Sequence, residues 1–231
     1  MWRSLCLAGM MLLLFQSTAD IAVAQEPEVA KGKVLARSYD FKEAGKKMDY
    51  SLYVPTSYDK EKPSPLIVAL HGLGSSARAI IRYPGFTSHA EKHGYLVVAP
   101  TGYNSRGWYG SRGKGGGRGD DPENLGELSE KDVMNVLALV RKEFNIDPKR
   151  IYLMGHSMGG GGTWHLGTKY PDIWAGLGPI APAAPRSTAG LDKIRHIPVI
   201  VIQGDQDRLI YGARRWVARM KELKMDHQYI E

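Results

Sequence analysis

Short apolar runs divide the chain into segments with two different periods. Four runs are continuous and rich in Val and Ile, as in parallel strands that are buried on both faces. They cover residues 65–72, 95–100, 150–155 and 197–204. A run at residues 48–55 alternates between apolar and polar positions instead, which predicts a half-buried strand. Residues 25–34 show no period and predict a loose N-terminal segment.

Two stretches, residues 133–144 and 213–223, carry apolar residues at the i, i+3, i+4, i+7 spacing of an amphipathic helix. The first follows Ser129 and Asp132, which resemble a capping box and predict that the helix begins there. Strands that alternate with helices predict an α/β fold with a mainly parallel central sheet flanked by helices. The 231 residues, of which 43% are hydrophobic, suffice for one domain with one sizeable core.

The N-terminal segment differs from the rest of the chain. An apolar run at residues 5–15 is followed by a small-residue cleavage site, Ala22-Val23-Ala24. This pattern predicts a signal peptide at residues 1–24, a mature domain at residues 25–231, and a secreted or periplasmic protein without a membrane anchor after cleavage. A buried core helix is the alternative. Cys6, the only cysteine, lies in this segment, so we expect no disulfide and no thiol chemistry.

Polar residues follow the predicted strands. His71, Thr101, Ser157 and Asp205 each come directly or almost directly after an apolar run. In open parallel sheets, the ligand site lies beyond the carboxyl ends of the strands. We therefore expect all four residues at one edge of the sheet.

Ser157 is the strongest candidate among them. It stands in the G-x-S-x-G pattern of residues 155–159, after an apolar strand and before an apparent helix at residues 163–170. This order predicts a nucleophile elbow, a tight turn that exposes a reactive serine. The backbone N–H groups of Met158 and of Leu73, in the loop after an earlier strand, are the predicted oxyanion donors. A glycine-rich phosphate-binding turn of another α/β protein is the alternative.

A serine nucleophile also needs an acid and a base. Asp207 is favoured as the acid over Asp205, because Asp205 lies so close to the strand end that it suits a turn. Five histidines fail as the base: one braces a loop, two flank Ser157, and two stand at the starting ends of strands, far from the serine. These are, in that order, His71, His156, His165, His196 and His227. We therefore expect the base histidine beyond residue 231, in a chain that is C-terminally incomplete, ends inside a strand and is prone to aggregate.

Residues 107–126 form a long glycine-rich loop that we expect at the same edge. The pattern of a phosphate-binding loop fails, because Trp108 stands where the first glycine belongs. Acidic residues offset its arginines, which disfavours nucleic-acid binding. Trp108 and Tyr109 are instead predicted to bind substrate by stacking on a sugar or polymer. The net charge of +7 suits contact with anionic polymers or plain solubility, and no cluster has metal-ligand spacing, so we expect no metal and no cofactor.

Several motifs together resemble one family of hydrolases. They read LIVALHGLGSS, YLVVAPTGY, RIYLMGHSMGGGGTW and IPVIVIQGDQD. Residues 48–231 are similar to secreted α/β-hydrolase esterases grouped with polyhydroxybutyrate depolymerases and feruloyl esterases, and to prolyl-oligopeptidase-type hydrolase domains. The resemblance implies an α/β-hydrolase fold, with Ser157 as nucleophile, Asp207 as acid and a base histidine just after the strand that begins at His227. Two departures are Gln203, where relatives often have histidine, and the run of four glycines in the elbow.

The sequence thus predicts a serine hydrolase that cleaves carboxylic esters, polymeric or carbohydrate-linked ones included, through an acyl-enzyme. A peptidase or acyltransferase of the same fold uses the same residues, and nothing in the sequence separates these activities. A non-catalytic hydrolase-fold protein that binds carbohydrate or polymer is the third hypothesis, and it rests on the missing base. The sequence carries no indication of an oligomeric state.

Overall fold

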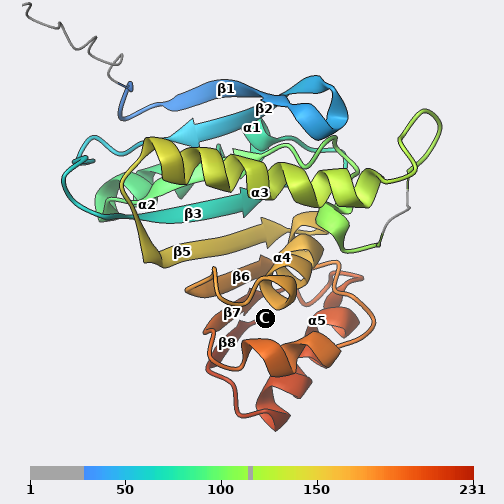
Figure 1. The fold of residues 1–231 in the computed structure, drawn as a ribbon. Coiled ribbons are helices and arrows are strands. Elements are labelled where there is room, and N and C mark those ends of the chain that lie inside the picture. Colours follow the sequence, from blue (N-terminus) through green and yellow to red (C-terminus); the bar gives the residue numbers. More distant parts are fainter. Residues whose placement is uncertain (1–28, 114–116) are drawn as a thin grey trace, which may run out of the picture.

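The computed structural model describes residues 29–113 and 117–231. One sheet of eight strands crosses the molecule in the order β1-β2-β4-β3-β5-β6-β7-β8, from β1 at the top of Figure 1 to β8 near the bottom. The strands are β1 (Val34–Phe41), β2 (Lys46–Tyr53), β3 (Ser64–Leu70), β4 (Leu96–Pro100), β5 (Ile146–His156), β6 (Gly176–Ile180), β7 (Val199–Ile202) and β8 (His227–Ile230). β2 is antiparallel to both of its neighbours, and all other pairs are parallel. The predicted mainly parallel α/β sheet is confirmed. The predicted signal peptide, with Cys6, lies outside the described residues.

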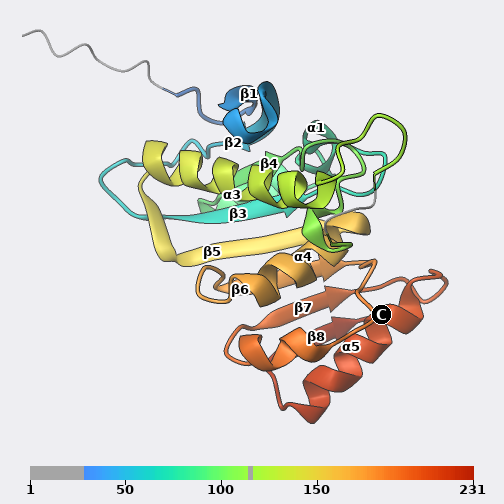
Figure 2. The same ribbon diagram turned by 45° about the vertical axis from the view of Figure 1, so that its right-hand side comes forward.

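Helices cover the two faces of the sheet unequally (Figures 1 and 2). They are α1 (Ala77–Ile80), α2 (Phe86–His93), α3 (Leu125–Glu143), α4 (Met158–Lys169) and α5 (Ile210–Glu222). Leu66, Val68 and Leu70 of β3 pack into the larger core, on the side of α3, α4 and α5. Ile67 and Ala69 point the other way, into a smaller core with α1 and α2. β3 is therefore buried on both faces, which explains its continuous apolar run.

The last two strands have a helix on one face only. Val199 and Val201 of β7 are buried in the core that α5 covers. Ile200, Ile202 and Ile230 are 45%, 40% and 53% exposed on the other face, where no helix of the described residues lies. An apolar sheet face that is open to solvent favours association. The predicted tendency of the protein to aggregate stays a prediction, with this face as its physical basis.

β6 is a strand that the apolar pattern does not predict. Its sequence, GLGPI, contains two glycines and a proline, which are poor strand formers. The glycines leave room for side chains of β5: a Cβ on Gly176 would lie 3.1 Å from Tyr152 Cδ1, and one on Gly178 would lie 3.3 Å from Met154 Cβ. Tertiary packing against a neighbouring strand therefore outweighs the weak local preference.

α3 begins at Leu125, four residues before the predicted capping box. The interpretation of Ser129 and Asp132 as a cap is wrong, because both are buried inside the helix and bind distant segments. Ser129 Oγ accepts the N–H of Tyr109 at 2.9 Å, and Asp132 Oδ2 accepts the N–H of Gly102 at 2.6 Å. Within the described ranges, no helix is long and apolar enough to cross a membrane.

Candidate active site

Ser157 occupies the turn between β5 and α4. Its φ of 55° and ψ of −110° lie in a region that residues with a side chain rarely adopt. The Ser157 N–H donates to Ile180 O at 2.9 Å, and the Ser157 carbonyl accepts the N–H groups of Gly161 at 3.1 Å and Ala183 at 2.9 Å. The predicted order of strand, turn and helix is present, and the helix begins five residues earlier than predicted. Three backbone hydrogen bonds hold the serine in its strained conformation.

At the glycines around Ser157, other segments of the chain approach the backbone so closely that a side chain would not fit. A Cβ on Gly155 would lie 2.3 Å from Gly159 O, so the strand and helix pass without room for a methyl group. The glycines of the four-residue run face three segments: a Cβ would lie 2.1 Å from Leu70 O on Gly159, 2.7 Å from Pro182 Cα on Gly160, 2.6 Å from Ala183 O on Gly161, and 2.7 Å from Tyr109 Cδ2 on Gly162. Each helical glycine costs about 1 kcal/mol relative to alanine. The close packing of α4 against three loops and strand ends explains why the run is tolerated.

The loop after β3 passes directly beside the serine. A Cβ on Gly72 would lie 3.6 Å from Ser157 Cβ. The next residue, Leu73, has a side chain that is 57% exposed. Neither the Leu73 N–H nor the Met158 N–H donates to a protein acceptor in the described part of the chain. The first N–H groups of a helix have no partner within it, so the Met158 N–H is free to bind an external oxygen.

His71 holds this loop in place. It is fully buried, with Nε2 at 2.8 Å from Thr101 O and Nδ1 at 2.8 Å from Gly72 O. The His71 backbone N–H donates to Tyr109 Oη at 3.0 Å. These contacts join the loops after β3 and β4 and agree with a bracing role for His71.

Asp207 lies in the loop that follows β7. Its Oδ1 accepts the Leu209 N–H at 2.8 Å, and its own N–H donates to Gly204 O at 3.1 Å. The side chain is half-buried, whereas Asp205 is exposed and accepts a hydrogen bond from the adjacent Gln206 amide. Because β5 and β7 both run parallel to β6, Ser157 and Asp207 follow the carboxyl ends of strands at the same edge of the sheet.

Seven histidines are present, and in the described structure none forms a hydrogen bond with Ser157 Oγ or the Asp207 carboxylate. His156 Nδ1 lies 3.0 Å from Tyr83 Oη. His227 pairs with Val199 at the start of β7, at the strand end opposite Asp207. The predicted nucleophile and acid thus follow strands at one edge of the sheet, and no described histidine is hydrogen-bonded to either side chain.

A cleft of about 790 Å³ opens beside the segments that are hydrogen-bonded to Ser157 and Asp207. Ala183, whose N–H binds the Ser157 carbonyl, lines it, and so does Leu209, whose N–H binds Asp207. Trp108 forms part of another wall. An ester held in this cleft would lie next to the elbow.

Comparison with known proteins identifies the family of the chain. A family model described as "Putative esterase" matches residues 42–216. The chain belongs to this esterase family. Feruloyl esterase B of Neurospora crassa is 30% identical over 126 residues, which are 53% of this chain and 39% of that protein. Poly(3-hydroxyalkanoate) depolymerase C of Paucimonas lemoignei is 34% identical over 125 residues, which are 51% of this chain and 28% of that protein.

Solved structures of esterases share the fold of this family member. The crystal structure of a thermostable esterase superposes with a TM-score of 0.67 at 26% identity and covers 86% of this chain and 54% of its own. The fold is the α/β-hydrolase fold, and the resemblance to feruloyl esterases and polyhydroxyalkanoate depolymerases is confirmed. The chain spans about half, or less, of the length of the curated relatives that it matches.

The two aromatic residues predicted to bind substrate have different surroundings in this esterase-family chain. Trp108 is half-buried at the cleft, and the Arg112 guanidinium carbon lies 3.3 Å from its ring centroid. Tyr109 is fully buried, and burial raises the pKa of its hydroxyl well above the ordinary value. Neither face of its ring is accessible to a substrate, contrary to the prediction from the sequence that Tyr109 stacks on a sugar or polymer. Tyr109 instead packs against the Gly162 position of α4, which fixes the turn that carries Trp108.

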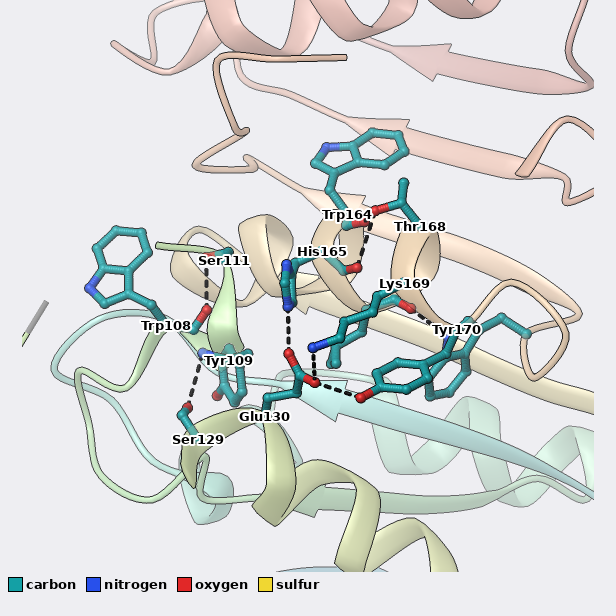
Figure 3. Close-up of polar contacts among 12 residues, drawn as sticks. Trp108, Tyr109, Ser111, Ser129, Glu130, Trp164, His165, Thr168, Lys169 and Tyr170 are labelled. Atoms are coloured by element: carbon teal, nitrogen blue, oxygen red, sulfur yellow. Dashed lines mark hydrogen bonds and ion pairs between the residues drawn. The ribbon is translucent and has the colours of Figure 1, made fainter. Parts of the chain in front are cut away.

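A carboxylate that the sequence analysis overlooked lies beneath this turn. Glu130 of α3 accepts hydrogen bonds from His165 Nε2 at 2.6 Å, Lys169 Nζ at 2.6 Å and Tyr170 Oη at 2.5 Å, and Figure 3 shows the three side chains converging on it. Burial alone would raise the pKa of Glu130, but these hydrogen bonds outweigh it and lower the pKa to about 2. The group joins α3 to α4. The only sign of this group in the sequence is a charged residue on the inward face of a predicted helix.

Proposed function

We propose that this chain supplies the nucleophile, the acid and the oxyanion donors of a serine hydrolase that cleaves carboxylic esters through an acyl-enzyme. The observation that carries the proposal is the conformation of Ser157, which is strained at a φ of 55° directly before α4 in a member of an esterase family. Its Oγ has no hydrogen-bond partner in the described part of the chain, so it is free to attack.

In the first step, Ser157 Oγ bonds to the ester carbonyl carbon while its proton passes to a base. The carbonyl oxygen becomes an oxyanion, which the N–H groups of Met158 and Leu73 bind. The positive end of the α4 dipole adds to this stabilisation. The intermediate then collapses, the alcohol leaves with the proton, and water attacks the acyl-enzyme to release the acid.

Asp207 acts as the acid that orients the base histidine. We propose that this histidine is none of the seven in the sequence and comes from beyond residue 231. The contacts of His71, His165 and His227 with carbonyl or carboxylate oxygens support the proposal, because these side chains are engaged elsewhere.

The proposed substrates are carboxylic esters, including polymeric or carbohydrate-linked ones. The open cleft beside the elbow supports this proposal, and so do the names of the relatives. We also retain the proposals that residues 1–24 are a signal peptide and that the protein is secreted or periplasmic. A non-catalytic binding protein is the second candidate, because no described histidine is hydrogen-bonded to Ser157 Oγ.

Hydrolysis of 4-nitrophenyl acetate, measured above the imidazole background with imidazole as the external base, tests the proposed reaction. We expect Ser157→Ala to lose most of the hydrolysis that the protein adds to this background. This added hydrolysis should be unchanged in Ser88→Ala, which alters an exposed serine on α2. Undiminished hydrolysis in Ser157→Ala would show that the activity does not use this serine.

Added imidazole tests the origin of the base. If the base is none of the seven histidines, imidazole should accelerate acylation of Ser157, since it can accept the proton from the serine. His156→Asn should not alter the rate. Loss of activity in a single-histidine variant, without a loss of stability, would identify a base within the chain and contradict this part of the proposal.

A further inference from the structure

The cleft beside Ser157 is lined by arginines. Arg112, Arg186, Arg208 and Arg215 all contribute to its wall, and no Asp or Glu of the described residues does. The four come from three separate segments: the turn after Trp108, the loop after β6, and the stretch that runs from the loop after β7 into α5. These arginines are spread along the sequence, and folding brings their positive charges together in the cleft wall.

None of these four guanidinium groups forms an ion pair in the described part of the chain. Other arginines of α5 do find carboxylates: Arg214 pairs with Glu231, and Arg219 pairs with Asp192. Arg214 and Arg215 are adjacent in sequence, yet only Arg215 faces the cleft. The lack of ion pairs is therefore specific to the arginines of the cleft and does not extend to the other arginines of α5 that find carboxylates.

Two of the cleft arginines are held in position by neutral groups. Arg112 stacks on the Trp108 ring at 3.3 Å, and Arg215 Nη2 donates to Pro185 O at 3.2 Å. Burial lowers the pKa of Arg112, and repulsion from Arg118 lowers it further. Like charges crowded in this way disfavour the folded state, and a bound anion offsets that repulsion. Trp108 accordingly orients a cation and does not offer that face to a sugar.

The cleft wall that carries these arginines is hydrogen-bonded to the two predicted catalytic residues. Ala183 in the cleft wall is hydrogen-bonded to Ser157, and Leu209, which follows Arg208, is hydrogen-bonded to Asp207. A guanidinium presents two parallel N–H donors that match a carboxylate. We propose that the cleft selects esters that carry a carboxylate on their acyl or alcohol part. The inference rests on the proposed function and adds the substrate class to it.

Binding to the Ser157→Ala protein tests the inference without a need for turnover. Two matched pairs of esters serve as probes: 4-acetoxybenzoate with 4-acetoxybenzamide, and mono(4-nitrophenyl) glutarate with its primary amide. Isothermal titration calorimetry should give at least about tenfold tighter binding of the anionic member in one pair. Raising the salt concentration should reduce this preference, because exposed charges are screened.

Arginine variants locate the preference. Arg208→Gln and Arg215→Gln, each in the Ser157→Ala background, should each reduce the ratio of anionic to neutral affinity by about threefold to tenfold. Arg214→Gln is the matched control on the same helix and should leave the ratio unchanged. Retention of the fold is checked for every variant by its melting temperature.

Equal affinity for the two members of both pairs would overturn the inference, as would an equal loss of preference in Arg214→Gln. Failure of the proposed function looks different. If wild-type protein hydrolyses the neutral esters but neither pair shows a preference, the hydrolase proposal stands and the carboxylate site falls. If the anionic members bind tighter but no ester is hydrolysed, the carboxylate site stands and the hydrolase proposal falls.

Discussion

Two groups of charges adjoin the turn of Trp108, Tyr109 and Gly110, and they differ in whether the protein itself neutralises them. Glu130 receives three hydrogen bonds, two of them from the potentially cationic groups of His165 and Lys169. A Cβ on Gly110 would lie 2.6 Å from Glu130 Oε2, so the turn rests directly on this group. Among the residues that the structure describes, the cleft, in contrast, has four arginines and no carboxylate in its wall.

The difference separates structural charge from functional charge. A buried carboxylate that is fully hydrogen-bonded stabilises the segments it joins, and its loss leaves the donors without a partner. A cation without an ion-pair partner adds no such stability to the folded protein. It can instead bind an anion from outside the protein. Changes at Glu130 should therefore alter stability, whereas changes at the cleft arginines should alter ligand preference.

The largest effect on stability is expected from Glu130→Ala. It leaves Lys169, His165 and Tyr170 without their shared acceptor between α3 and α4. We expect the free energy of unfolding to fall by about 3 kcal/mol, as when one partner of a buried ion pair is removed. Urea unfolding measures this. Glu123→Ala, on an exposed residue without such contacts, is the control. If the two variants were equally stable, the structural role assigned to Glu130 would be wrong.

Gly110→Ala should have the next largest effect. Gly110 has a φ of 82°, and the new Cβ would clash with both Glu130 and His165 at 2.6 Å. We expect a loss of about 2 kcal/mol from backbone strain and steric overlap. Gly113→Ala, at a φ of 80° with no atom within 4 Å, carries the strain alone and should cost about 1 kcal/mol. Equal losses in the two variants would mean that the turn does not rest on Glu130.

Acid should remove the contribution of Glu130. Its pKa is lowered from 4.5 to about 2 in the folded protein, so the ionised group stabilises the fold above about pH 4.5 and this contribution is lost as the pH falls toward 2. The difference in melting temperature between wild type and Glu130→Gln should be full at pH 6 and should shrink below pH 4.5. A difference that is constant from pH 6 to pH 3 would contradict the ionised state of Glu130.

The cleft arginines should have the smallest effect on stability. Arg186→Gln and Arg208→Gln remove cations that have no ion-pair partner in the described structure, so the free energy of unfolding should stay within about 0.5 kcal/mol of wild type. Thermal unfolding at low salt measures the change. A marked loss of stability would assign these arginines a structural role and weaken the contrast with Glu130.

The sequence predicts those parts of the molecule that depend on local pattern. The continuous apolar run of β3, the spacing of α5 and the elbow at Ser157 each lie within one short segment, and the structure contains all three elements. β6 and the start of α3 are missed or misplaced. Gly176 leaves room for a side chain of β5, and Ser129 accepts a hydrogen bond from the Tyr109 N–H. Both contacts are with other segments of the chain, so the local pattern does not reveal them.

The site shows the same division. The strand-end positions of Ser157 and Asp207 follow from topology, which the alternation of strands and helices reveals. The burial of Tyr109 depends on the bare surface at Gly162, more than fifty residues away in the chain. The arginine-lined cleft is assembled from three segments, so no single stretch of sequence indicates it.

Covalent labelling of Ser157 tests the central claim most directly. The protein is incubated with a fluorophosphonate, with imidazole present as an external base, and the adduct is located by peptide mass spectrometry. We expect a single adduct on the peptide that contains Ser157, and no adduct in Ser157→Ala. An adduct on a different residue, or the same labelling in the Ser157→Ala protein, would contradict it.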